Sequence, residues 1–289
     1  MNYIGMNYKY IDAHTHINFP EFDVDREAVI SRAKSAGVFI VNVGTDLGSS
    51  KAVVELASKN DGMKAIVGIH PTEIKSFDTS DKVWKELLEL AKNENVVGIG
   101  ECGLDYFHAE EQEWGFQKEA FIKQIEIANL VGKSLMLHIR NGKTNKNAYK
   151  EVLEILRDFK KDQEDSSKNA KVHDAHNPLK ADDSLCGNVH FFAGTLEEAC
   201  EFIDLGFSIS FTGVLTFTRD YDEIVKFVPL NMILSETDAP FVAPVPYRGK
   251  RNEPVYVIEA VKKMAEIKGV SEDLMAEEIM KNAKRLFKI

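Results

Sequence analysis

The chain has 289 residues and a formal net charge of −10, with 44% hydrophobic and 28% charged residues. A protein that holds duplex DNA by neutralising many phosphates is expected to be basic, so this charge argues against a large nucleic-acid-binding face. A nucleic-acid substrate should instead be gripped locally, by metal ions and a few arginines. Cys102, Cys186 and Cys200 lack CxxC spacing, which argues against a thiolate metal site or a disulfide framework and fits a reducing compartment.

Residues 1–10 show no signal-peptide pattern of a charged region followed by an apolar one. No apolar run approaches the roughly 18 residues that a membrane-spanning helix needs. We therefore expect a cytoplasmic protein without membrane association. A stable protein partner cannot be inferred from the sequence.

Short β-branched runs alternate with longer amphipathic stretches along the chain. Strands are expected at residues 10–13, 38–43, 65–69, 96–100, 134–137, 188–189, 207–211 and 231–235. Helices are expected at residues 23–36, 49–60, 81–93, 111–131, 148–159, 196–205, 221–227, 255–268 and 271–288. Almost continuously apolar strands are typical of a parallel sheet covered by helices. Eight strand–helix units in this length favour an α/β fold, a closed (β/α)₈ TIM barrel with additional C-terminal helices.

No shift in composition marks a domain boundary, so residues 1–289 are expected to form a single domain. The stretch 160–187 is rich in Lys, Asp, Ser and Asn and has little apolar periodicity. We expect a solvated surface insertion there, because the stretch cannot bury enough apolar surface to order itself. It contains His173 and His176, which resemble a metal cluster, but an isolated tract lacks the rigid support that metal ligands need. We interpret these two histidines as unrelated to metal binding.

The first strand ends in the run Asp12-Ala13-His14-Thr15-His16. Alternate side chains of a strand point to the same face, so His14 and His16 are expected to project together. Such a pair is either half of a metal site or a hydrogen-bonded pair in the core, and the run alone does not distinguish the two. Asp12 is expected to support a ligand from behind.

Further side chains with ligand chemistry stand at the ends of later strands: His70, Glu101, His138, His190 and Asp238. Each has a structural alternative when taken alone, such as a packed core histidine or a helix-capping carboxylate. In a barrel, however, the C-terminal ends of all strands share the rim on which enzyme chemistry occurs. Nitrogen and oxygen ligands without sulfur suit Zn²⁺, Mn²⁺ or Mg²⁺. The joint pattern therefore predicts a centre for two divalent metal ions.

The chain resembles the TatD family of metal-dependent deoxyribonucleases, which are amidohydrolase-type barrels. The matching segments run in family order from end to end: Asp12-Ala-His-Thr-His16, Gly68-Ile-His-Pro71, Gly100-Glu-Cys-Gly-Leu-Asp105-Tyr106, Leu137-His-Ile-Arg140, His190-Phe-Phe-Ala-Gly194, Ser210-Phe-Thr-Gly213, Glu236-Thr-Asp-Ala-Pro240 and Arg248-Gly-Lys-Arg-Asn252-Glu-Pro254. The longer stretch 160–187 is the main departure from the family.

The resemblance implies two ions with separate ligand sets. One set consists of His14, His16 and Asp238. The other consists of His138 and His190, with Glu101 bridging the two ions. The resemblance further implies that His70 and Arg140 contact the scissile phosphate of the substrate or orient a ligand. Arg248 and Arg251 are candidates for additional phosphate contacts, because guanidinium matches phosphate oxygens well, although both have the alternative of being solvated loop residues.

Paired cations neutralise a phosphodiester, lower the pKa of bound water and stabilise charge on the attacking and departing oxygens. We therefore expect a 3′-5′ exonuclease that hydrolyses DNA at single-stranded or frayed ends, with RNA as an open alternative substrate. Asp238 is expected to accept the proton of the attacking water while Glu101 bridges the ions, so both are candidate catalytic residues.

Two other functions stay open. An amide or ester hydrolase, acting for example on aminoacyl-tRNA, would use the same centre, but no lysine stands at a strand end to carry a carbamate bridge. A metal-stabilised binding scaffold without turnover would not need the complete ligand set.

Overall fold

The computed structural model describes residues 8–75, 81–144, 146–170 and 185–289. Within them, eight strands form one sheet in which each strand pairs in parallel with the next one in sequence. The strands are β1 (Tyr10–Thr15), β2 (Val38–Val43), β3 (Met63–Val67), β4 (Val96–Asp105), β5 (Ser134–Arg140), β6 (Gly187–Val189), β7 (Phe207–Phe211) and β8 (Ile233–Ser235). The predicted TIM barrel is confirmed.

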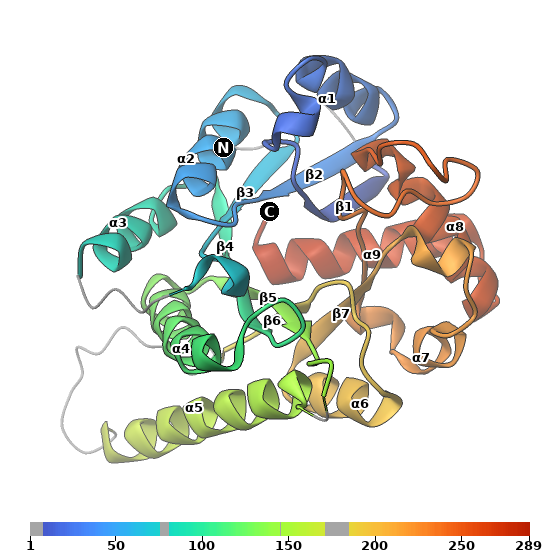
Figure 1. Ribbon diagram of the computed structural model, residues 1–289. Coiled ribbons are helices and arrows are strands. Elements are labelled where there is room, and N and C mark those ends of the chain that lie inside the picture. The colour runs from blue at the N-terminus through green and yellow to red at the C-terminus, as the bar shows by residue number, and fades with distance from the viewer. Residues whose placement is uncertain (1–7, 76–80, 145, 171–184) are drawn as a thin grey trace.

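Helices surround the strands (Figure 1). They are α1 (Arg26–Ser35), α2 (Leu47–Lys59), α3 (Asp81–Ala91), α4 (Trp114–Val131), α5 (Ala148–Ala170), α6 (Leu196–Asp204), α7 (Asp222–Phe227), α8 (Val257–Lys268) and α9 (Glu272–Phe287). None of the described helices is long and apolar enough to cross a membrane.

Local sequence signals set several helix ends. At the start of α2, Asp46 accepts a hydrogen bond from the Ser49 N–H, and the Ser49 hydroxyl accepts one from the Asp46 N–H. This reciprocal pair satisfies two backbone donors that a helix start leaves free. Helices α4 and α8 end at Gly132 and Gly269, whose φ angles of 63° and 68° lie in the left-handed region that favours glycine.

The barrel closes where β8 meets β1. The Asp238 N–H donates to the His14 carbonyl at 2.9 Å, and the His16 N–H donates to the Ala239 carbonyl at 2.8 Å. The backbone beyond β8 therefore pairs with the backbone that carries the two histidines. As a result, the closure of the barrel and the position of Asp238 depend on the same hydrogen bonds.

The buried carboxylate of Asp12 ties this β8–β1 seam together with side-chain bonds. It accepts the Thr237 hydroxyl at 2.5 Å, the Thr237 N–H at 2.8 Å and the His14 N–H at 3.3 Å. The Ser235 hydroxyl donates across the same seam to the Ile11 carbonyl at 2.8 Å. Asp12 thus lies behind His14, in the supporting position expected from the sequence.

Helix α9 packs against both strands of the seam from the outside. Its Asn282 side chain donates to the carbonyls of Leu230 and Ile233, at 2.7 Å and 2.9 Å, which anchors the helix to the start of β8. At the other end of the helix, the Tyr10 hydroxyl of β1 donates to the Glu272 carboxylate.

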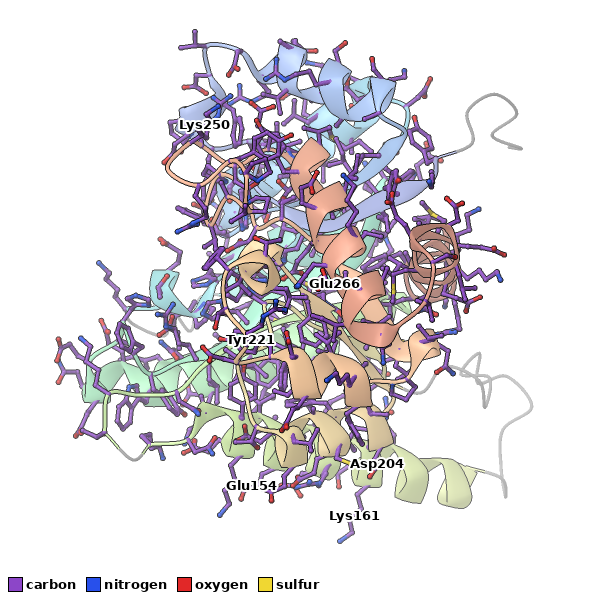
Figure 2. The ribbon with its side chains drawn as sticks, turned by 90° about the vertical axis from the view of Figure 1, so that its right-hand side faces the viewer. Glu154, Lys161, Asp204, Tyr221, Lys250 and Glu266 are labelled. Carbon is purple, nitrogen blue, oxygen red and sulfur yellow. The ribbon has the colours of Figure 1, made fainter. Side chains whose placement is uncertain are left out.

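The prediction that residues 160–187 lack regular structure is wrong for residues 160–170, because α5 continues through them. Residues 160–170 include three lysines, one glutamine, one glutamate and one alanine, which are good helix formers. Adding residues to an existing helix is also far easier than starting a new one. Glu154 and Lys161 project from this helix away from the barrel (Figure 2). His173 and His176 lie outside the described residues, and the single-domain organisation of residues 1–289 stays a prediction.

The expectation that Glu101 and His138 follow their strands is also wrong, since both lie inside them. The pairing of β4 with β5 continues past the apolar run, through Gly103 with His138 and Asp105 with Arg140. These polar positions stay in the ladder because their side chains find partners at the rim.

Replacing Thr237 by valine tests the seam. The Thr237→Val substitution keeps the side-chain shape but removes the hydroxyl that donates to Asp12, so the free energy of unfolding should fall by about 1–3 kcal/mol. Urea unfolding followed by circular dichroism measures this change. The control is Thr218→Val, which removes a hydroxyl in an exposed turn and should change stability by less than about 0.5 kcal/mol. Equally small effects of both variants would contradict the role of the seam.

Candidate metal centre

The buried side chain of Glu101 lies at the middle of the predicted rim. It belongs to β4, whose pairing with β5 shifts register between Ile99 and Cys102. Such an irregularity re-aims the side chains within it. The Glu101 carboxylate here meets five imidazoles that come from four segments of the chain.

The Oε2 atom of Glu101 faces the first group of side chains. It lies 3.3 Å from His14 Nε2 and 3.5 Å from His16 Nε2. Asp238 Oδ1 lies 3.8 Å and 3.6 Å from the same two nitrogens, which are themselves 3.0 Å apart. Two imidazole nitrogens and two carboxylate oxygens therefore crowd together at the end of β1.

The Oε1 atom of Glu101 faces the second group. It lies 2.8 Å from both His138 Nδ1 and His190 Nε2, and 3.4 Å from His70 Nε2. Each oxygen of one carboxylate thus serves a different set of ring nitrogens. His70, which was expected to contact substrate, belongs to this second group.

In three of the five histidines, the ring nitrogen that faces away from Glu101 has a hydrogen-bonding partner. The pairs are His16 Nδ1 with Val43 O at 2.9 Å, His70 Nδ1 with Thr72 Oγ1 at 2.6 Å and His138 Nε2 with Asp105 Oδ2 at 3.0 Å. The acceptors Val43 O and Asp105 Oδ2 place the proton of His16 and His138 on the nitrogen that faces away, and leave the other nitrogen available to a metal ion. His70 differs, because its Nδ1 atom accepts the Thr72 N–H at 3.2 Å, which places the proton of the neutral ring on Nε2. In His14 and His190, by contrast, Nδ1 is buried without a hydrogen bond.

The carboxylates of the centre are held in their ionised form. Burial by itself raises the pKa of Glu101, but the imidazoles of His190, His14 and His70 outweigh burial and lower that pKa well below its usual range. Burial likewise raises the pKa of Asp238, and the surrounding imidazoles lower it overall. Buried carboxylates that stay charged need a compensating cation or protonated neighbours.

The donor set fits divalent metal ions. Among the described residues, three groups place their ligand atoms within 4.8 Å of one another: His14 with His16 and Glu101, His70 with Glu101 and His138, and His14 with His190 and Glu236. The donors are imidazole nitrogens and carboxylate oxygens, in the mixture that suits Zn²⁺ or Mn²⁺. The facing Nε2 atoms of His14 and His16 are placed as two ligands of one ion would be.

Two of the arginines expected at the substrate stand exposed over aromatic rings. Arg140 ends β5 and lies 4.6 Å from the centroid of the Phe107 ring. Arg248 donates to the Ala243 carbonyl at 2.8 Å and lies 4.1 Å from the centroid of the Phe217 ring.

Arg251 differs from these two because carboxylates already engage its charge. Its guanidinium donates to both carboxylate oxygens of Asp25 at 2.8 Å, and to Glu253 at 3.2 Å. Bidentate pairing of this kind is the strong form of an arginine–carboxylate contact.

Sequence reasoning did not predict two members of the cluster. Glu236 was not singled out, although a carboxylate two residues before Asp238 at a strand end was a visible signal. Asp105, which appeared only within a matching segment, contacts His138 and also accepts the Nδ1–H of His108 at 2.8 Å.

Comparison with known proteins places the chain in a family. The family model described as TatD related DNase matches residues 11–288. An uncharacterized metal-dependent hydrolase of Bacillus subtilis, YabD, is 35% identical over 281 residues, which covers 96% of this chain and 98% of that protein. An uncharacterized metal-dependent hydrolase of Escherichia coli, YcfH, is 32% identical over 287 residues and covers 96% of each chain.

Comparison with solved structures supports the same family. The Escherichia coli TatD homologue YjjV superimposes with a TM-score of 0.81 at 26% identity, covering 98% of this chain and 100% of its own. A mutant organophosphorus hydrolase from Deinococcus radiodurans shares only the fold, with a TM-score of 0.59 at 11% identity over 98% of this chain and 95% of its own. Because the family model matches residues 11–288, nearly the whole chain, the chain belongs to the family of TatD-related DNases.

Proposed function

We propose that this protein is a metal-dependent hydrolase that cleaves phosphodiester bonds of DNA. The observation that carries the proposal is the division of ring nitrogens between the two oxygens of Glu101, as expected for a carboxylate that bridges two ions. The family description names a DNase, and the relatives YabD and YcfH are named metal-dependent hydrolases, which supports the same reaction class.

We assign one ion to His14, His16 and Asp238, and the other to His138 and His190, with Glu101 between them. When bound, two divalent cations neutralise the phosphodiester, acidify water and stabilise the departing oxygen. The candidates are Mg²⁺, Mn²⁺ and Zn²⁺, because residue types alone do not select among them.

Exposure indicates which side of the centre meets the substrate. The side chains of Asp238, His70 and His138 are 15%, 14% and 17% exposed, whereas those of His14 and His16 are at most 4% exposed. We propose that Asp238 accepts the proton of the attacking water on this open side. We further propose that His70 contacts the scissile phosphate on the same side.

Arg140 and Arg248 are proposed to contact further phosphates, because both are exposed and neither guanidinium is paired with a carboxylate among the interactions described above. We leave Arg251 out of this group, since Asp25 and Glu253 already neutralise its charge.

An aromatic path from solvent to the centre supports a single-stranded substrate. The Phe19 ring stacks on His16 with centroids 4.6 Å apart, and Phe241 meets Phe19 edge-on at 6.3 Å. Phe241 is 47% exposed and follows Asp238 by three residues. Exposed aromatic rings bind unpaired bases by stacking. We therefore propose that a base of a single-stranded or frayed end stacks on Phe241 while its phosphate lies at the centre.

Digestion of end-labelled oligonucleotides tests the reaction. Protein stripped of metal and reloaded with Mg²⁺, Mn²⁺ or Zn²⁺ should shorten 5′-labelled single-stranded DNA stepwise from its 3′ end, faster than a blunt duplex, and a chelator should abolish cleavage. RNA and aminoacyl-tRNA serve as parallel substrates. Intact DNA under all three ions, with normal metal binding, would overturn the nuclease proposal, and cleavage of aminoacyl-tRNA alone would indicate an ester hydrolase.

The Asp238→Asn variant separates a catalyst from a metal-stabilised scaffold. Loss of the proton-accepting carboxylate should lower kcat by at least about 100-fold, the usual contribution of a general base. The melting temperature of the metal-free variant should stay close to that of the metal-free wild type. The control is Asp220→Asn, at an exposed loop carboxylate, which should leave both quantities unchanged. A variant that loses stability but keeps its turnover would contradict the role of Asp238.

The Phe241→Ala variant tests base stacking. We expect KM for single-stranded DNA to rise about tenfold, within the range for loss of one stacked base. Hydrolysis of an abasic single-stranded oligonucleotide, which has no base to stack on Phe241, should be unchanged. Phe227→Ala is a matched control, because Phe227 is 41% exposed but lies at the end of α7, away from the rim. An equal loss of activity on both substrates would indicate instead that Phe241 supports the structure of the centre.

A further inference from the structure

We propose that Glu236 is a positioning residue shared by the two groups of metal ligands. In the metal-bound centre its carboxylate would accept the Nδ1–H of both His14 and His190, and so present the Nε2 of each ring toward Glu101. This role rests on the proposed metal binding and adds to it a residue that neither the ligand assignment nor the sequence reasoning uses.

The two rings lie in a matched orientation. His14 and His190 stack with centroids 3.9 Å apart and an angle of 10° between their planes. The Nε2 atom of each faces Glu101, at 3.3 Å and 2.8 Å. Their Nδ1 atoms therefore lie on the opposite side of the rings from Glu101.

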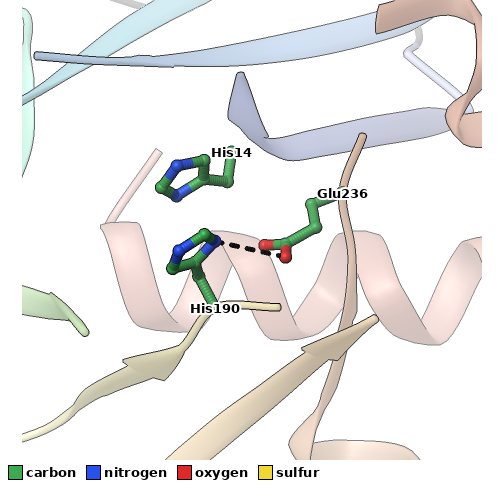
Figure 3. Close-up of side chains that lie close together, drawn as sticks. All are labelled: His14, His190 and Glu236. Atoms are coloured by element: carbon green, nitrogen blue, oxygen red, sulfur yellow. Dashed lines mark ion pairs between the residues drawn. The ribbon is translucent and has the colours of Figure 1, made fainter. Parts of the chain in front are cut away.

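Glu236 is the acidic side chain on that opposite side (Figure 3). Its Oε1 atom lies 3.5 Å from His190 Nδ1, and its carboxylate belongs to one group with His14 and His190 in which the ligand atoms lie within 4.8 Å of one another. Both Nδ1 atoms are buried and make no hydrogen bond at these distances. A buried N–H without an acceptor is strongly disfavoured. His190 Nδ1 needs only a small approach to donate to Glu236, whereas His14 needs a larger one, because the structure places the ligand atoms of this group only within 4.8 Å of one another.

The carboxylate is held in place from two other strands. The Ser210 hydroxyl of β7 donates to Oε2 at 2.6 Å, and the Phe191 N–H, which follows β6, donates to Oε1 at 2.5 Å. The Asn188 side chain of β6 in turn donates to the Ser210 hydroxyl at 2.6 Å. Glu236 is therefore a preorganised acceptor, fixed before any ion arrives.

One consequence separates this role from that of an ordinary ligand. His14 belongs to the group at Glu101 Oε2 and His190 to the group at Oε1, so loss of Glu236 should weaken the binding of both ions together. If His14, His190 and Glu236 instead held a third ion, loss of Glu236 would remove one equivalent and leave the other two unchanged.

Calorimetric titration of metal-free protein with Zn²⁺ tests this. Glu236→Met removes the acceptor at similar side-chain length, and the affinity for both ions should fall about 10- to 100-fold, the usual effect of losing a partner behind a ligand. Glu236→Gln keeps an acceptor oxygen, so its affinity for Zn²⁺ should fall less than that of Glu236→Met. Glu198→Met is the matched control, because Glu198 is a buried carboxylate that caps α6 beside Thr195, and its loss should lower the melting temperature without changing Zn²⁺ affinity.

Nitrogen-detected NMR of the histidine rings reports which ring nitrogen carries the proton. Replacing a residue with a purely structural role would not change this result. In the metal-free wild type, where no ion fixes the tautomer, His14 and His190 should both carry the proton on Nδ1, a result that stands even if Glu236→Met fails to fold. In the variants the two rings should lose this uniform tautomer. Unchanged tautomers and affinities, or loss of one separate equivalent, would overturn the role of Glu236. Failure of the wild type to bind Zn²⁺ would overturn the proposed function itself.

Discussion

The rest of the centre depends on one buried carboxylate, that of Glu101. Burial raises the pKa of this carboxyl, yet the imidazoles of His190, His14, His70 and His138 lower it overall and hold the group in the ionised form. The carboxylate can be shared in this way because it is part of the barrel wall, at the register shift of β4 against β5. Backbone pairing fixes its position, and each of its oxygens then organises a separate set of ring nitrogens.

The seam between β8 and β1 links the stability of the barrel to the geometry of the centre. Asp238 occupies a left-handed backbone conformation, with φ of 56°, that is uncommon for a residue other than glycine. The hydrogen bond from its N–H to His14, together with the bonds between Asp12 and Thr237 beside it, holds the chain in that conformation. The same bonds that close the barrel therefore bring Asp238 to the two histidines of β1.

The centre has an open side and a closed side with different chemistry. Asp238, His70 and His138 reach solvent at the rim, where a substrate can approach and a proton can leave. Glu236 lies fully buried behind the stacked rings of His14 and His190, where its contacts are with the protein. A rigid, dry side that orients the ligands and a solvated side that meets the substrate are what a hydrolytic metal centre requires.

The barrel and the residues of the rim followed from the sequence because they rest on local, periodic signals. The strands at 38–43 and 207–211 are observed with the expected bounds, and alternation along β1 correctly put His14 and His16 on one face. Other features depend on contacts between distant segments, which no local pattern encodes. Tertiary structure alone decided that β4 shifts register at Glu101, that Arg251 pairs with Asp25, and that Glu236 stands behind His14 and His190. Each of these features is set by how the closed barrel brings strand ends and loops together, and so appears only once the chain has folded.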